Sequence, residues 1–141
     1  MAIVSGDREV RILTKNMVDS DSTITVSHGG TTANLYDRDL ETEYTTAGAA
    51  RDTISATISI TFNVGSTETQ FTFNALMLFN TNVKTIKLES WNSTTSVWVN
   101  QFTRVLVNNS LCLTFGAIKT SRVRLTLYDT QTKFNQEKFI G

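Results

Sequence analysis

The chain has 141 residues, with 13 basic and 13 acidic side chains and a formal net charge of zero. This length predicts one domain that can bury a full core without a metal or a disulfide. The balanced charge excludes a basic surface that would attract nucleic acid or an anionic membrane. No run of residues reaches the roughly 20 apolar positions of a membrane-spanning helix, so membrane insertion is not expected.

Alternation of apolar and polar residues predicts a chain made almost entirely of β-strands. The clearest case is residues 53–63, where every second side chain is apolar. Successive side chains of a strand point to opposite faces of a sheet, so this pattern is typical of a half-buried strand. Short strands separated by turns favour a β-sandwich or barrel. We expect strands at about 8–14, 23–27, 42–46, 53–63, 69–79, 84–91, 96–101, 102–107, 111–115, 122–128 and 136–140.

The same alternation predicts which residues form the core. Phe71, Phe73 and Phe79 are expected on one face of a central strand. Arg122 and Arg124 are expected to face solvent. Cys112, the only cysteine, lies between two leucines and is expected to be a buried thiol rather than a nucleophile. The predicted core set is Ile54, Ile58, Ile60, Phe71, Phe73 and Leu125.

A polar turn within residues 33–46 is the most informative segment for function. Asp37 and Asp39 flank Arg38 in this turn, and Thr42 and Tyr44 follow at short offsets. The next segment is the strictly alternating one. An acid turn that leads into a sandwich strand is more typical of a binding module than of an enzyme.

The sequence offers little for catalysis. His28 is the only histidine. Ser27 and Ser5 are the serines that could act with it as a nucleophile, but neither lies in a sequence typical of a turn that exposes a nucleophile. The chain also has no glycine loop of the kind that binds phosphate. We therefore expect no catalytic residues and no enzymatic activity.

Five short segments follow one another in an order that is known from a protein superfamily. They are residues 33–44 (Ala-Asn-Leu-Tyr-Asp-Arg-Asp-Leu-Glu-Thr-Glu-Tyr), 76–82 (Leu-Met-Leu-Phe-Asn-Thr-Asn), 86–88 (Ile-Lys-Leu), 96–98 (Ser-Val-Trp) and 139–141 (Phe-Ile-Gly). In this order they resemble the discoidin-like, galactose-binding-like superfamily, which includes coagulation-factor C-type domains and many carbohydrate-binding modules. The resemblance implies an all-β jelly-roll β-sandwich of two antiparallel sheets, with residues 1–141 as a single domain. It also implies that Trp98 packs in the core.

The opening of the chain carries a narrower resemblance. Residues 11–19 and 23–26 are similar to the start of phage and prophage tail or virion proteins. This similarity implies a location in a virion or tail particle. Residues 138–141 have the pattern of an apolar strand that is still incomplete at the last residue. We therefore expect the chain to be the N-terminal part of a longer polypeptide.

Many members of the superfamily hold a structural calcium ion at the acid turn. By position, Asp37, Asp39 and Thr42 would hold it here, and carboxylate and hydroxyl oxygens are ligands that Ca²⁺ prefers. Arg38 stands where the family usually has glycine, so a backbone with positive φ is less favourable at this point. In the alternative, the two aspartates only cap the turn by accepting hydrogen bonds from its own amides. Both interpretations stay open.

Ligands of the superfamily usually bind in loops at one end of the sandwich. Trp91 falls on the outward register of its strand beside an asparagine turn, and an exposed indole offers a flat apolar surface to a sugar ring. Side chains in neighbouring loops could supply hydrogen bonds to sugar hydroxyls. The predicted ligand-binding residues are Trp91, Asn80, Asn82 and Tyr36.

Two functions stay open from the sequence. The first is a non-catalytic recognition module that binds a carbohydrate within a phage-like tail or virion protein. The second is a structural domain that assembles a larger particle with other subunits and has no small-molecule ligand. In the second case the chain would form an oligomer and a neighbouring subunit would cover Trp91, because exposed aromatic side chains also mark protein interfaces.

Overall fold

The computed structural model of the chain describes residues 16–36, 41–47, 54–131 and 137–140. The strand expected at 8–14 lies outside the described residues. In chain order the elements are β1 (Thr23–Val26), the short 3-10 helix η1 (Thr32–Leu35), β2 (Tyr44–Thr45), β3 (Ala56–Thr61), β4 (Asn63–Val64), β5 (Thr67–Glu68), β6 (Phe71–Leu78), β7 (Thr85–Asn92), β8 (Val97–Val105), β9 (Leu111–Thr120), β10 (Arg122–Leu127) and β11 (Phe139–Ile140).

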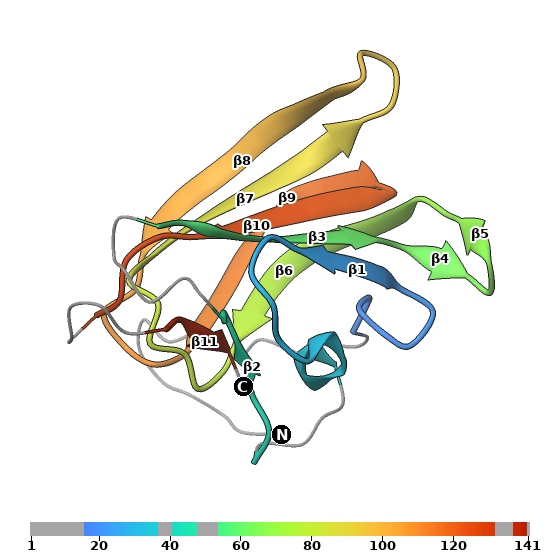
Figure 1. Ribbon diagram of the computed structural model, residues 1–141. Helices are drawn as coiled ribbons and strands as arrows, with labels where there is room; N and C mark the ends of the chain where they lie inside the picture. Colours follow the sequence, from blue (N-terminus) through green and yellow to red (C-terminus); the bar gives the residue numbers. More distant parts are fainter. Residues whose placement is uncertain (1–15, 37–40, 48–53, 132–136, 141) are drawn as a thin grey trace, which may run out of the picture.

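The strands form a sandwich with one large sheet. Its five strands follow the order β1-β3-β10-β7-β8, and every neighbouring pair is antiparallel. Facing it are the antiparallel pair β6–β9 and the short pair β11–β2, while β4 and β5 form a small hairpin. Figure 1 shows the five strands side by side, with the β7–β8 hairpin extending away from the others. The predicted fold class, an all-β jelly-roll sandwich of antiparallel sheets, is confirmed.

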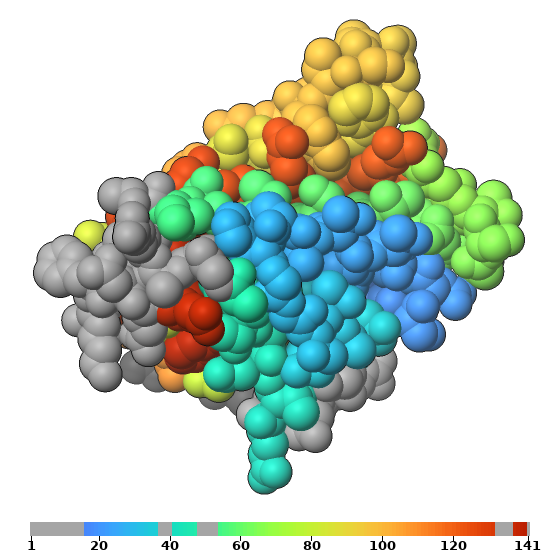
Figure 2. Space-filling view, viewed as in Figure 1, coloured from blue at the N-terminus to red at the C-terminus, as the bar shows by residue number. Residues whose placement is uncertain are grey.

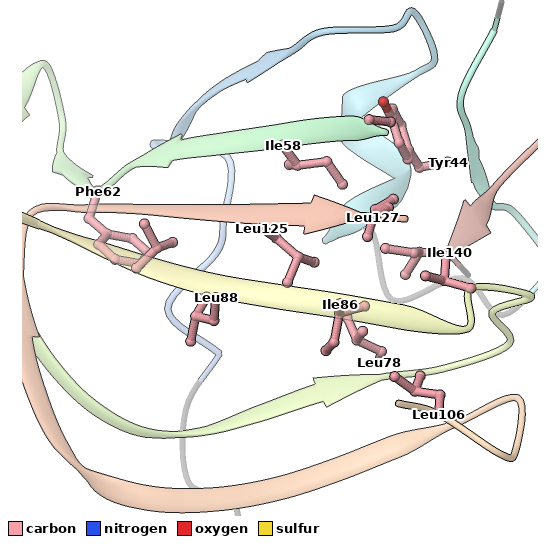
Figure 3. Packing of buried hydrophobic residues seen from close by; sticks show 13 residues of the cluster. Tyr44, Ile58, Phe62, Leu78, Ile86, Leu88, Leu106, Leu125, Leu127 and Ile140 are labelled. Carbon is pink, nitrogen blue, oxygen red and sulfur yellow. The ribbon is translucent and has the colours of Figure 1, made fainter. Parts of the chain in front are cut away.

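The core lies between the two sheets. Side chains of β3, β10 and β7, among them Ile58, Leu125 and Ile86, point toward Leu78 on β6 (Figure 3). The predicted inward positions Ile58 and Leu125 are buried, and the other predicted members are partly buried against the same cluster. The fully or nearly buried apolar set is Tyr44, Ala56, Ile58, Phe62, Leu78, Val83, Ile86, Leu88, Leu106, Val123, Leu125, Leu127 and Ile140.

An irregularity in the pairing of β6 with β9 overturns one prediction. Phe73 pairs with Ile118 but Ala75 pairs with Thr114, so two steps along β6 correspond to four along β9 and the extra residues lie on β9. The alternation is interrupted there, and beyond it the core-facing residues of β6 are Leu76 and Leu78. Phe73 therefore packs on the core, while Phe79 is 44% exposed instead of sharing its face. The exposed Asn74 lies at this irregularity. A polar residue within this apolar strand was the signal that sequence reasoning missed.

Two further expectations about burial are wrong. Cys112 is exposed, because Leu111 beside it pairs with the buried Leu78 and so takes the inward position. Trp98 is half-buried on the outer face of the large sheet, since it lies directly opposite Trp91 in the β7–β8 pairing. The two strands expected at 96–101 and 102–107 are one strand, β8.

Within the described part of the chain, no helix has the length and apolar character needed to cross a membrane.

Candidate functional site

Three of the four predicted ligand-binding residues, Asn80, Asn82 and Trp91, are divided between opposite ends of the sandwich. We call residues 79–84, 107–110 and 128–131 the loop end, because backbone hydrogen bonds tie these loops together, such as Thr81 N to Asn109 O (2.8 Å) and Lys84 N to Asp129 O (2.7 Å). Asn80 and Asn82 belong to it. Trp91 lies near the opposite end of β7, which we call the hairpin end. Trp91 lies six positions along the strand from Thr85, a distance of roughly 20 Å. The structure therefore does not bring Trp91 together with the two asparagines.

The side chain of Asn82 is engaged by the backbone of the last strand. Its Nδ2 donates to Glu137 O (2.8 Å), and its Oδ1 accepts from Phe139 N (2.9 Å). Thr81 adds a hydrogen bond from its hydroxyl to Phe139 O (2.6 Å). These contacts fix β11 against the loop end, so Asn82 has a structural role in this arrangement.

Asn80 and Phe79 offer a different surface. Asn80 is exposed, and its φ of 41° is in the left-handed region, which asparagine tolerates better than most residues. Phe79 precedes it and is 44% exposed. A flat apolar ring beside an amide that can donate and accept hydrogen bonds matches the alternating C–H and hydroxyl surface of a sugar. Sequence reasoning missed Phe79 because the irregular pairing of β6 with β9 turns it outward.

The helix η1, which Tyr36 ends, lies beside β2. Tyr36 is the half-buried residue that ends η1, and Asn34 of the same helix donates from its Nδ2 to Glu43 O (2.8 Å). Thr42 is half-buried nearby, whereas Asp37 and Asp39 lie outside the described residues. Two carboxylates and a hydroxyl suit Ca²⁺ by their chemistry, and the calcium site stays a prediction. Among the described residues, no three His, Cys, Asp or Glu side chains cluster as a metal site.

A cluster of two tryptophans and two arginines covers the outer face of the hairpin end. The rings of Trp91 and Trp98 meet edge to face, with centroids 5.3 Å apart and an interplanar angle of 63°. The guanidinium of Arg122 lies 5.6 Å from the Trp91 ring centroid, and that of Arg124 lies 4.5 Å from the Trp98 centroid. Cation–π contacts of this kind stabilise the pair. They also occupy ring surface, so Trp91 is less available for stacking on a sugar than its outward register suggested.

Both arginines are held by glutamates. Arg122 donates from its Nε and an Nη to the two carboxylate oxygens of Glu68 (2.7 and 2.8 Å), and Ser121 Oγ donates to the same carboxylate (2.6 Å). The hydrogen bond from Arg122, aided by that from Ser121, lowers the pKa of Glu68 to about 2. Arg124 on β10 donates in the same way from its Nε to Glu89 Oε2 on β7 (2.8 Å). This hydrogen bond lowers the pKa of Glu89, although burial acts to raise it.

The Glu68–Arg122 pair predicts an acid-dependent loss of stability. The Glu68 pKa is lowered from 4.5 to about 2. The pair therefore contributes fully to the free energy of unfolding above pH 4.5, and this contribution is lost as the pH falls toward 2. Both side chains are more than a third exposed, which limits the effect to under about 1 kcal/mol. Thermal unfolding of Glu68→Gln and of the unchanged protein should differ most above pH 4.5 and converge near pH 2. A difference independent of pH would contradict this assignment.

The inner face of the hairpin end carries an open cavity of about 390 Å³. It lies between the β7–β8 hairpin and the last residues of β9. Ser90, Trp91 and Asn92 line it from β7. The Trp91 ring also contacts the Trp98 ring on the outer face. Gln101 reaches it from a bulge in β8 and donates from its Nε2 to Ser90 Oγ (2.7 Å). The polar lining is completed by Gln70, Ser93, Thr94 and Lys119.

No protein-family model and no curated protein matches the sequence. Solved structures do match by shape. The family 32 carbohydrate-binding module of Clostridium perfringens NanJ, solved in complex with galactose, is 12% identical with a TM-score of 0.64. The match covers 86% of this chain and 93% of that module. The chain has the galactose-binding-like, discoidin-like fold.

Two other solved structures share this fold. The chitosan-binding module 1 of a Paenibacillus chitosanase/glucanase is 18% identical, with 85% of this chain and 93% of that one covered and a TM-score of 0.62. A family 29 fucosidase of Ruminococcus gnavus in complex with fucose is 13% identical, with a TM-score of 0.68. There the match covers 86% of this chain and only 24% of the fucosidase. The galactose-binding-like fold therefore spans nearly all of the single modules and about a quarter of the enzyme.

Proposed function

We propose that this galactose-binding-like domain is a non-catalytic carbohydrate-binding module with its principal site at the loop end. The fold supports this, because the neighbours that it matches over nearly their whole length are carbohydrate-binding modules. The observation that carries the proposal is the exposed ring of Phe79 beside the exposed Asn80, at the junction of three loops that backbone hydrogen bonds hold together.

The loop end has the features that a weak sugar site needs. Phe79 provides an apolar platform, and Asn80 provides a donor and an acceptor within one residue of it. Asn108 and Asn109 are exposed on the adjoining turn. This turn is fixed to the site by Thr81 N, which donates to Asn109 O (2.8 Å), and by Gln131 Nε2, which donates to Asn108 O (2.8 Å). A fixed polar rim around an exposed ring reduces the entropy lost on binding.

Substitution of Phe79 tests the proposal. A screen of galactose, N-acetylgalactosamine, fucose and chito-oligosaccharides by calorimetry or chemical-shift titration should find weak, saturable binding. Phe79→Ala should weaken it about tenfold, because the stacking surface is removed. Phe79→Trp should keep or strengthen it. Val107→Ala is the matched control, since Val107 is an even more exposed apolar residue of the same end.

Two outcomes would contradict a loop-end sugar site. The first is the absence of saturable binding to every glycan in the screen. The second is binding of unchanged strength in a folded Phe79→Ala protein. Loss of binding in Val107→Ala as well would indicate a general disturbance of the loops rather than a lost platform.

The finer proposal is that this module belongs to a phage or prophage tail or virion protein. What supports it is the similarity of residues 11–19 and 23–26 to the start of such proteins. A glycan-binding module at the surface of a tail would attach the particle to a host polysaccharide. Binding to purified bacterial surface polysaccharide, with loss in Phe79→Ala, is the expected result.

An assembly domain without a small ligand is the second candidate, and β8 is the observation that favours it. This nine-residue strand lies at the edge of the large sheet, where unpaired backbone groups can pair with another chain. Val97 and Val105 are 49% and 62% exposed along it. A stable oligomer by light scattering, dissociated by Val105→Lys and indifferent to glycans, would favour assembly over recognition.

A further inference from the structure

We propose that the cavity at the hairpin end is a second carbohydrate subsite, and that it takes a sugar bearing an anionic group. It is separate from the loop-end site, because the two lie at opposite ends of β7. The chemistry of the lining points to a sugar. Hydroxyl and amide side chains of Ser90, Asn92 and Gln101 line the cavity, and such groups bind sugar hydroxyls by donating and accepting hydrogen bonds.

The hydrogen bonds already made within the cavity leave specific atoms for a ligand. Gln101 uses its Nε2 on Ser90 Oγ (2.7 Å), so its Oε1 can accept from a sugar hydroxyl. Asn92 uses its Oδ1 to accept from the backbone N–H groups of Thr94 and Thr95 (3.0 and 3.1 Å), so its Nδ2 can donate to a sugar oxygen. A donor on β7 and an acceptor on the neighbouring β8 suit a polyhydroxylated ligand.

Charge decides which kind of sugar fits. Of the described residues that line the cavity, Lys119 is charged and the others are uncharged. The carboxylates of Glu68 and Glu89 are already paired with Arg122 and Arg124. The Lys119 ammonium is a strongly hydrated charge on a flexible stem and can reach a carboxylate or sulfate at the mouth. A uronic acid, a sialic acid or a sulfated sugar provides that group.

The hairpin is held in a shape that keeps the cavity open. On its outer face the Trp91–Trp98 pair and the two arginines fix the strands against β10. On its inner side Thr120 Oγ1 donates to Trp91 O (2.8 Å), which ties β9 to β7 at the edge of the cavity. The β7–β8 hairpin stands clear of the body of the molecule in the space-filling view (Figure 2). A preformed site binds with less loss of conformational entropy.

Titration with three defined oligosaccharides tests the proposal: trigalacturonate, a sulfated galactotriose and neutral galactotriose. The two acidic probes should shift backbone amide signals of residues 90–94 and 117–119, and one probe binding without the other identifies carboxylate or sulfate as the preferred group. Lys119→Gln should weaken acidic binding about fivefold to tenfold, because one charge-assisted contact is lost. Added salt should weaken it as well.

Matched variants keep this test separate from the loop-end site. Lys84→Gln removes an exposed lysine of the loop end and should leave acidic binding unchanged. Val99→Trp places a large side chain on the cavity wall and should abolish acidic binding in a protein of normal melting temperature. Phe79→Ala should reduce neutral-sugar binding only.

The outcomes distinguish failure of this inference from failure of the proposed function. Unchanged acidic binding in both Lys119→Gln and Val99→Trp would overturn the hairpin-end subsite, while Phe79-dependent binding of neutral sugars would leave the loop-end proposal intact. Absence of any acidic binding would likewise overturn the subsite. Acidic binding that depends on Lys119 in a protein that binds no neutral sugar would support the subsite and contradict the loop-end site.

Discussion

Replacing Phe62 by alanine should lower the free energy of unfolding by about 3–5 kcal/mol. Phe62 is 3% exposed and directly follows β3 of the large sheet. Its ring meets those of Phe71 and Phe73 on β6 edge to face, with centroids 5.9 and 6.1 Å apart. Its loss would therefore leave a cavity where the two sheets join and remove two aromatic contacts. Denaturant unfolding should show a lower midpoint with an unchanged slope.

Phe79→Ala is the matched control for this prediction. It makes the same change of side chain, but Phe79 is 44% exposed, so the expected loss is about 1 kcal/mol or less. Equal losses for the two variants would contradict the packing of Phe62 between the sheets. The small effect at Phe79 also means that a change in sugar binding there reports on the site and not on folding.

Gly30→Ala should be the second severe change, with a loss of about 1–3 kcal/mol or more from overpacking. A Cβ at this position would overlap the carbonyl oxygen of Thr45 and would lie 2.6 and 2.8 Å from two ring carbons of Tyr44. Neither neighbour can easily move. Thr45 is paired with β11, and the buried Tyr44 ring is held by a hydrogen bond from its hydroxyl to His28 O (2.7 Å).

Gly29→Ala is the control, because it adds the same methyl group one residue earlier. Its nearest neighbour would be the Cβ of Ala47 at 3.9 Å, an ordinary contact. We expect a change within about 0.5 kcal/mol, as for most surface substitutions. If thermal unfolding showed both glycine variants equally stable, the close approach of Gly30 to β2 would be wrong.

Local pattern alone determined the fold class and the register of most strands. Ile86, Leu88, Leu125 and Leu127 alternate with polar residues, and all four are buried as that alternation predicts. These predictions hold because the period of side chains along a strand is a property of the strand itself. The sequence also pointed toward a binding module, through the acid turn and the lack of a nucleophile–base pair.

Only the tertiary structure decided where exposed groups gather. Whether Phe79 faces the core depends on an irregularity that appears when β6 pairs with β9, and a single chain segment does not specify the pairing partner. Trp98 is on the outer face because β8 pairs with β7 in the register that sets it opposite Trp91. The distance between Trp91 and Asn80, and the cavity beside Lys119, likewise follow from how strands far apart in sequence are placed. Such sites depend on non-local contacts, which periodicity does not encode.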